Sequence, residues 1–282
     1  MGVLLGRVCF CAFALGLSGC MTFFYYPTSK TYFDPAQAGL RPEDVTFTTG
    51  SGEKIHAWWF ESAVRPSKGT IVFFHGNAEN LTSHFASLMW LPKEGYSYLI
   101  FDYPGYGRST GRTTAKGTVE AGHAALEWVH RNKDPRPLII YGHSLGGNVA
   151  LRTALELRGE IPYKAIVIDA SFPSYQKIAA NKLSQFWITW PFQPLAYLLV
   201  SDSYAPKGIQ QLSPVPMLII HGQSDLAVEP EYGERLYELA GDPKEIWRIP
   251  GGVHGSTFWS HDLVYRRKFL DYLTSLDRAV KP

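Results

Sequence analysis

Cysteine is scarce in this sequence: the 282 residues include three, at positions 9, 11 and 20. Residues 21–282 contain none, so a disulfide within that part of the chain is excluded. An excess of charge of one sign is also missing, because 27 Lys and Arg are balanced by 25 Asp and Glu, a net charge of +2. This balance gives no electrostatic footprint for nucleic acid, and we expect no nucleic-acid partner.

A membrane-spanning run is missing at the N-terminus. The apolar segment from Val8 to Leu17 is shorter than the roughly 20 residues that a spanning helix needs, and Arg7 is the only charge near it. This pattern is typical of a secretory signal peptide. The tetrapeptide Leu17-Ser18-Gly19-Cys20 resembles the lipobox of bacterial lipoproteins. The alternative is an ordinary signal peptide with a chance cysteine.

The lipobox resemblance implies cleavage before Cys20 and acylation of that cysteine. Several acyl chains would anchor the protein firmly, at about 0.8 kcal/mol for each buried methylene. Because Met21 rather than aspartate follows, the resemblance implies the outer membrane of a Gram-negative bacterium. We therefore expect a signal peptide at residues 1–19, a lipidated N-terminal arm at 20–40 and one large domain at 41–282.

The rest of the chain alternates apolar strands with segments of helical spacing. We expect strands at 45–49, 55–60, 70–74, 97–101, 137–141, 165–168, 216–220 and 245–249, and helices at 81–94, 114–132, 148–158, 231–240 and 263–276. The first two strands should form a hairpin. Continuously apolar strands separated by helices predict an α/β fold with a mostly parallel sheet covered on both faces. In such sheets, functional groups collect at the carboxyl ends of the strands.

The clearest motif is Gly142-His143-Ser144-Leu145-Gly146, which matches Gly-x-Ser-x-Gly between an expected strand and an expected helix. Glycines on either side of the serine allow strand and helix to come close. The helix N-terminus offers unpaired N–H groups to negative charge. The motif predicts Ser144 as a nucleophile, and a serine hydroxyl needs a neighbouring base.

Five sequence blocks together resemble the α/β-hydrolase superfamily and, within it, the Bem46-like group that includes the ABHD13 and ABHD17 type proteins. They are His75–Asn80, Phe101–Ser109, Gly142–Gly147, His221–Asp225 and Gly252–His254. The resemblance implies an α/β-hydrolase fold and a serine hydrolase. Departures from the family pattern are Glu79, where glycine is frequent, and Pro104, where arginine is frequent.

The resemblance implies His254 as the base and Asp225 as the acid that orients it. The chain order Ser, Asp, His is the order expected for this fold. Asp169, at the end of the preceding strand, is the alternative acid, and His261 is the alternative base. An oxyanion hole needs two N–H donors. Leu145 follows the nucleophile and supplies one.

By the same resemblance, Asn77 supplies the second donor of the oxyanion hole; a helix cap and turn is the other interpretation of 77–80. The other histidines and acids receive structural roles. We expect the side chain of His143 to point away from the pocket, and strand-end groups to brace loops. This second set comprises His75, His221 and Asp102, with His123 and His130 on a helix.

No metal or cofactor is expected. No histidine pair has helical ligand spacing with a carboxylate, and Gly105-x-Gly107 lacks the next glycine of a dinucleotide-binding loop.

Residues 172–214 are rich in aromatic side chains and prolines and occupy the place where α/β-hydrolases insert a cap over the pocket. An aromatic cap predicts an apolar acyl or aryl substrate. Three functions are compatible with the sequence. They are a hydrolase of carboxylic esters or thioesters acting through an acyl-enzyme, a serine peptidase, and a non-catalytic surface lipoprotein. A peptidase usually needs acids in the cap, and Asp202 is the only one there. We expect a monomer anchored to a membrane by its lipid, with a small-molecule or lipid acyl substrate.

Overall fold

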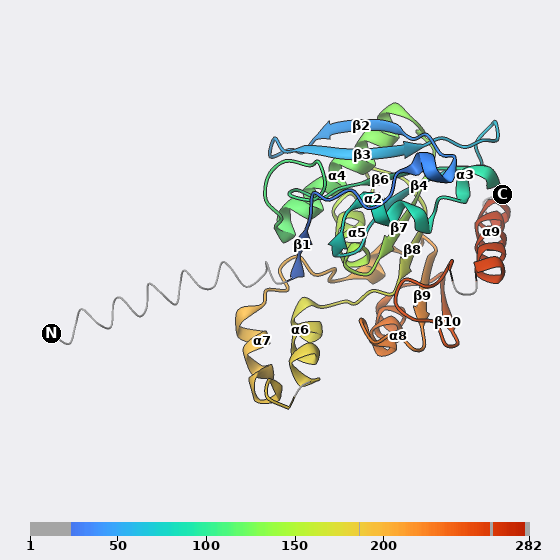
Figure 1. The fold of residues 1–282 in the computed structure, drawn as a ribbon. Coiled ribbons are helices and arrows are strands. Elements are labelled where there is room, and N and C mark those ends of the chain that lie inside the picture. The colour runs from blue at the N-terminus through green and yellow to red at the C-terminus, as the bar shows by residue number, and fades with distance from the viewer. Residues whose placement is uncertain (1–23, 186, 260–261, 280–282) are drawn as a thin grey trace.

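The computed structural model describes residues 24–185, 187–259 and 262–279. The expected signal peptide, the lipidation site Cys20 and the alternative base His261 lie outside the described residues. Helix and strand labels below follow Figure 1.

The described residues form an eight-stranded sheet in the order β10-β9-β8-β7-β4-β6-β3-β2. Strands β10 to β6 are parallel along that order, and the β2–β3 hairpin adds two antiparallel strands at one edge. The bounds are β2 Glu43–Thr48, β3 Lys54–Phe60, β4 Gly69–Phe74, β6 Tyr96–Phe101, β7 Leu138–His143, β8 Tyr163–Asp169, β9 Met217–Gly222 and β10 Lys244–Ile249. Each expected strand is present, with bounds within two residues of those predicted.

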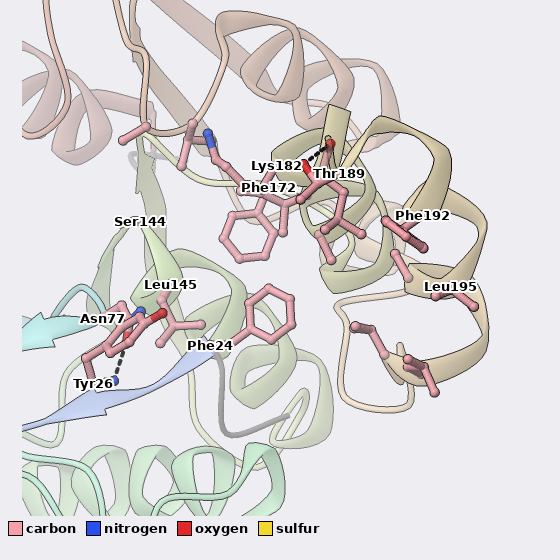
Figure 2. Close-up of a pocket in the computed structure, with 18 of the residues that line it drawn as sticks. Phe24, Tyr26, Asn77, Ser144, Leu145, Phe172, Lys182, Thr189, Phe192 and Leu195 are labelled. Atoms are coloured by element: carbon pink, nitrogen blue, oxygen red, sulfur yellow. Dashed lines mark hydrogen bonds between the residues drawn. The ribbon is translucent and has the colours of Figure 1, made fainter. Parts of the chain in front are cut away.

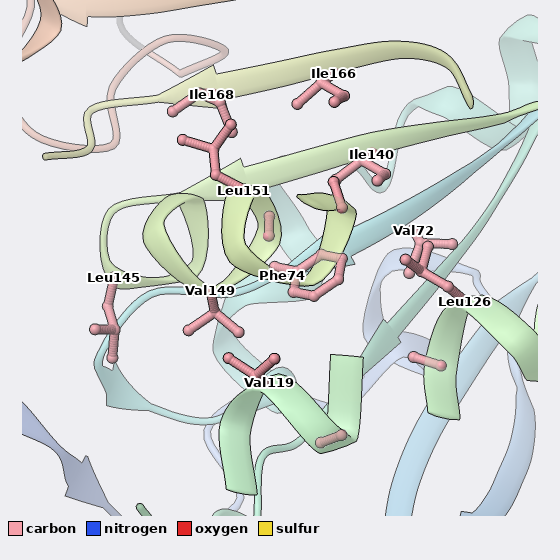
Figure 3. Packing of buried hydrophobic residues seen from close by; sticks show 14 of the residues in the cluster. Val72, Phe74, Val119, Leu126, Ile140, Leu145, Val149, Leu151, Ile166 and Ile168 are labelled. Atoms are coloured by element: carbon pink, nitrogen blue, oxygen red, sulfur yellow. The ribbon is translucent and has the colours of Figure 1, made fainter. Parts of the chain in front are cut away.

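Side chains of each central strand alternate between two apolar layers, as the period of two in a strand requires. In β4, Val72 and Phe74 belong to the layer between the sheet and helices α4 and α5. Ile71 and Phe73 belong to the layer between the sheet and α9. Figure 3 shows the first layer, where strand side chains meet those of both helices. Covering on both faces explains why these strands are continuously apolar in sequence.

The long helices match the expected ones within three residues at each end. They are α4 Ala115–Asn132, α5 Leu145–Glu156, α8 Pro230–Leu239 and α9 Asp262–Ala279. The mostly parallel sheet and its covering helices confirm the expected α/β-hydrolase fold.

The prediction of a single helix at 81–94 is wrong. The structure has three short pieces instead: α2 Leu81–His84, η3 Phe85–Ser87 and α3 Leu91–Glu94. Pro92 has no N–H to donate to the Leu88 carbonyl, so one helix cannot continue through residues 88–92, and α3 begins anew with Pro92 in its first turn. The apolar spacing persists because Leu81, Phe85, Leu88 and Leu91 all pack in the layer below α9.

The N-terminal arm crosses the carboxyl end of the sheet. Its strand β1 (Tyr26–Pro27) pairs in parallel with β5 (Ala78–Glu79) in the loop after β4. Farther along, Asn80 donates hydrogen bonds from Nδ2 to the carbonyls of Thr28 and Lys30, both at 2.8 Å. Asn80 also caps α2 through its Oδ1. The arm is thus bound to the loop that follows β4.

Residues 172–214 contain α6 (Tyr175–Ser184), η4 (Trp190–Phe192), α7 (Gln193–Leu199) and η5 (Ile209–Leu212). Helices α6 and α7 pack against each other and extend away from the sheet as a helical hairpin (Figure 1). Within the described residues, no helix combines the length and apolar character needed to cross a bilayer.

Candidate active site

Ser144 lies between β7 and α5 on a strained turn. Its φ of 55° and ψ of −125° are unfavourable for a residue with a Cβ, and such a conformation costs roughly 1–3 kcal/mol. Gly142 and Gly146 make the turn possible. A Cβ on Gly142 would lie 2.6 Å from Gly147 Cα, and one on Gly146 would overlap the carbonyl of Phe74. The Ser144 N–H donates to the Asp169 carbonyl at 2.8 Å, which ties the turn to β8.

The structure brings Ser144, His254 and Asp225 together from three separate loops. Nε2 of His254 lies 3.0 Å from Ser144 Oγ, and Nδ1 of His254 lies 2.7 Å from Asp225 Oδ2. An ionised carboxylate only accepts, so Nδ1 carries the proton and Nε2 is free to accept from the serine hydroxyl. This is the geometry of a nucleophile, a base and a group that orients the base.

Asp225 is held in its ionised form. Burial alone would raise its pKa, but the hydrogen bond and charge of His254 outweigh burial, and the pKa of Asp225 is lowered. Its Oδ1 also accepts from the N–H groups of Ala227 and Val228, at 2.8 and 2.9 Å. His221 braces the same loop by donating from Nε2 to the Val228 carbonyl at 2.8 Å.

The alternative acid, Asp169, occupies a different environment. Its two oxygens accept from Tyr141 Oη at 2.7 Å and Thr257 Oγ1 at 2.9 Å. Burial raises the pKa of Asp169 despite these bonds. Asp169 therefore ties β7 and β8 to the loop that carries His254, while Asp225 contacts the imidazole itself.

The two expected oxyanion donors both line the cavity next to Ser144. Leu145 is the first residue of α5, where a helix leaves its N–H groups without partners inside the helix. Asn77 is held through its side chain: Oδ1 accepts from the Tyr26 N–H at 2.9 Å and from Tyr106 Oη at 3.0 Å. These bonds fix the side chain of Asn77, a residue that lines the same cavity as Ser144.

Other groups singled out in the sequence brace loops. His75 donates from Nδ1 to the Gly76 carbonyl at 2.7 Å, and Asp102 accepts from the Leu81 N–H at 2.8 Å. His143 is not among the residues that line the cavity, and its ring centre lies 5.0 Å from that of His254. On the outer helices, His123 lies 3.0 Å from Glu156. Among the residues that the structure describes, no group of His, Cys, Asp and Glu is arranged to hold a metal ion.

Ser144 and His254 open into a cavity of about 700 Å³ between the sheet and the α6–α7 hairpin. Figure 2 shows Ser144, Leu145 and Asn77 on one side and the side chains of the hairpin opposite. The cavity wall is mainly apolar. It includes Phe24, Tyr26, Phe172, Ile178, Ala179, Leu183, Phe192, Leu195, Ala196, Leu199, Val200, Ala227 and Val228, with Lys182 and Thr189 as polar members.

The sequence did not reveal that the N-terminal arm belongs to this site. Phe24 and Tyr26 line the cavity, and the Tyr26 N–H holds Asn77. The available signal was the density of aromatic residues between positions 23 and 35, which has no period and no motif.

The fold and the site together define a serine hydrolase of the α/β-hydrolase superfamily. The chain belongs to the family described as serine aminopeptidase, S33, whose model matches residues 65–213, or 149 of the 282 residues.

Relatives and solved structures extend this similarity along most of the chain. The chain is 33% identical over 264 residues to the uncharacterized protein YfhR of Escherichia coli K12, covering 90% of this chain and 87% of that protein. It is 29% identical over 227 residues to the lysophosphatidylserine lipase ABHD12 of Danio rerio, covering 76% of this chain and 57% of that protein. The Pyrococcus furiosus esterase Pf2001 has a similar fold, with a TM-score of 0.73 at 21% identity, covering 89% of this chain and 98% of the esterase.

Proposed function

We propose that the protein hydrolyses carboxylic esters or thioesters with an apolar acyl part, through an acyl-enzyme intermediate. The observation that carries this proposal is the large apolar cavity whose wall includes both Ser144 and His254. Such a cavity removes an acyl chain from water, and each buried methylene contributes about 0.8 kcal/mol. An acyl chain lying between the sheet and the α6–α7 hairpin has its carbonyl at the nucleophile.

Catalysis begins when Nε2 of His254 takes the proton of the Ser144 hydroxyl and Oγ attacks the acyl carbonyl carbon. The carbonyl electron pair moves to the oxygen, and the N–H groups of Asn77 and Leu145 stabilise that oxyanion. Asp225 stabilises the imidazolium that forms. The tetrahedral intermediate collapses, the alcohol or thiol leaves with the proton from His254, and the acyl group stays on Ser144.

Deacylation repeats these steps with water. His254 takes a proton from a water molecule, the hydroxide attacks the acyl-serine carbonyl, and the same two N–H groups hold the oxyanion. Collapse of this second intermediate releases the fatty acid and returns the proton to Ser144 Oγ. One ester and one water are consumed, and the enzyme is regenerated.

A peptidase is the second candidate because the family description names aminopeptidases. An aminopeptidase has to bind the free amine of its substrate, and an acid near the nucleophile is the usual partner. Among the described residues, those lining the cavity include no Asp or Glu. Asp202 is engaged elsewhere, accepting from Ser174 Oγ at 2.6 Å and from the Gln176 N–H at 3.1 Å. These contacts favour an ester or thioester over an aminoacyl substrate.

We also propose that the protein is a lipoprotein of the Gram-negative outer membrane, acylated at Cys20, and that it acts as a monomer. The support is the lipobox pattern at residues 17–20. The five motif blocks further support a place in the Bem46-like group. Mass spectrometry of the N-terminal peptide tests the acylation, and an unmodified Cys20 in a processed chain would contradict it.

The hydrolase proposal is tested in two steps on the full chain. A fluorophosphonate probe should label the wild type and Ser275→Ala, an exposed serine on α9, and should fail to label Ser144→Ala. A panel of p-nitrophenyl esters should then show a kcat/KM that rises with acyl length, by up to about fourfold per methylene. The same enzyme should be poor on amino-acid anilides. Absence of labelling supports a non-catalytic protein instead, and a preference for anilides supports the peptidase.

A further inference from the structure

Exposed apolar side chains are concentrated in one segment of this protein, which runs from the turn after α6 to the C-terminal end of α7. Fourteen large hydrophobic side chains are exposed among the described residues, and seven of them fall within residues 187–198. Trp187 is 85% exposed, Leu198 73% and Trp190 62%. We call this group the apolar tip; its members are Trp187, Ile188, Trp190, Phe192, Leu195, Tyr197 and Leu198.

The tip also lacks charged side chains, which would favour its exposure to water. From Leu183 to Ser201 the sequence contains no Asp, Glu, Lys or Arg. Most of the described residues in this segment are nevertheless exposed. Single exposed hydrophobic residues are ordinary on soluble proteins, but a contiguous apolar group marks an interaction site. Tryptophan and tyrosine prefer the boundary between lipid and water, because their rings are apolar at one end and polar at the other.

The tip is continuous with the active-site cavity. Phe192 and Leu195 belong to both, because they line the cavity and are 51% and 42% exposed (Figure 2). The hairpin carries the tip away from the sheet (Figure 1). An acyl chain that enters across the tip therefore reaches Ser144 along apolar side chains.

The described part of the chain begins at the same cavity. Phe24, the first described residue, lines the cavity wall. Phe24 is four positions after Cys20, and four extended residues reach at most about 14 Å. Any acyl chain on Cys20 thus starts within that distance of the Phe24 backbone.

We propose that the apolar tip docks on a lipid bilayer, with Trp187 and Trp190 at the level of the headgroups, so that the active-site cavity opens toward the membrane. Phe24, four positions after Cys20, lines the same cavity as the tip residues Phe192 and Leu195, and an uncharged aromatic surface matches a lipid surface. This docking does not require the proposed hydrolysis, because the tip residues Trp187, Trp190 and Leu198 are absent from the cavity wall.

Tryptophan quenching by brominated lipid tests the docking directly. The full chain is reconstituted in vesicles of phosphatidylcholine and phosphatidylglycerol, with and without bromine on the acyl chains. The wild type should lose emission up to the share of two of its eight tryptophans. The double variant Trp187→Ser/Trp190→Ser should lack that quenching. The matched control is Trp259→Ser, which removes a tryptophan that is 50% exposed on the loop after His254. This variant should keep the bromolipid quenching.

Three outcomes would overturn the proposal. The first is equal bromolipid quenching in the wild type and the double variant. The second is a tip-dependent dimer in sedimentation without lipid, which assigns the tip to a contact between copies. The third is a wild-type emission that is already blue-shifted without vesicles through Trp187 and Trp190, which assigns the tip to a contact within the chain itself. Thermal unfolding by circular dichroism checks that each variant folds, and repeating the quenching in Ser144→Ala separates docking from hydrolysis.

Discussion

The backbone N–H of Tyr26 donates a hydrogen bond to Asn77 Oδ1 at 2.9 Å, and this bond links the N-terminal arm to the loop beside the nucleophile. Tyr106 Oη donates to the same oxygen at 3.0 Å. One side-chain oxygen, held by two donors from distant segments, thus determines the orientation of a residue whose backbone we assign to the oxyanion hole.

Tyr106→Phe should lower kcat on an acyl ester by about fivefold and change KM little. The variant loses one net hydrogen bond of about 1 kcal/mol that orients the oxyanion donor, and such an interaction matters most in the transition state. Steady-state kinetics measure the two constants separately. Tyr98→Phe is the control, because that hydroxyl bonds the Phe85 carbonyl and is absent from the cavity wall. A change confined to KM would contradict this role for Asn77.

Ser144→Gly should be inactive yet more stable than Ser144→Ala. Both variants lack the nucleophile, but only glycine adopts a φ of 55° with a ψ of −125° without strain. The relief of roughly 1–3 kcal/mol exceeds the extra entropy that glycine gives the unfolded chain, about 0.4–1 kcal/mol. Denaturant unfolding of the two variants measures the difference. A Ser144→Gly variant that is less stable than Ser144→Ala by about 0.4–1 kcal/mol, the entropy difference alone, would show that the turn is not strained.

Asp225→Asn should reduce kcat by roughly 10³–10⁴-fold, because the imidazole loses both its tautomer control and its counter-charge. Asp169→Asn should cost far less activity, since Asp169 bonds Tyr141 and Thr257 rather than the His254 ring. Burst kinetics with a p-nitrophenyl ester, with folding checked by circular dichroism, compare the two. A larger loss in the Asp169 variant would reassign the acid.

Stability should fall as the pH drops below about 6.5. Burial, together with His75, lowers the pKa of His84 from 6.5 to about 3, and burial lowers the pKa of His143 well below its usual value. Unfolding lets both residues bind protons, so the unfolded state holds more protons and acid favours it, by up to about 1.4 kcal/mol per pH unit for each histidine. The contribution of these two histidines to the free energy of unfolding is fully present above pH 6.5. It decreases as the pH falls from there toward their pKa values in the folded protein.

Urea unfolding at pH 7.5, 6 and 5 measures that slope, and His84→Gln/His143→Gln should make it shallower. An unchanged slope in the double variant would place the acid sensitivity in other groups.

Ala179→Phe should shift the substrate preference toward shorter acyl chains. Ala179 lines the cavity from α6, and a phenyl ring there takes up space that the distal methylenes of a long chain would occupy. The p-nitrophenyl ester panel should show a lower kcat/KM for long chains with short-chain esters preserved. Ala179→Ser, which keeps the size of the side chain, should leave the profile as it is. A uniform loss at all lengths would mean that acyl chains do not reach this wall.

Local sequence patterns predicted most of the strands and helices. Because the central strands are buried on both faces, each has a short, continuously apolar sequence. These apolar runs predicted the bounds of the strands within two residues. The strained turn at Ser144 was visible as well, since close strand-to-helix packing requires Gly142 and Gly146. The helix expected at 81–94 failed because its apolar spacing reflects a shared core face, while Pro92 interrupts the backbone ladder.

The sequence by itself determined the strands of the eight-stranded sheet, the long helices, the nucleophile turn and, through its motif blocks, the residues offered as acid and base. Only the tertiary structure decided that Asp225 rather than Asp169 contacts His254, and that the arm residues Phe24 and Tyr26 share a cavity with Ser144. The physical reason is that turns and strands arise from neighbours in the chain. A catalytic triad and a cavity wall join residues more than a hundred positions apart. Ser144 and His254 are 110 positions apart, and their meeting depends on how the whole sheet assembles.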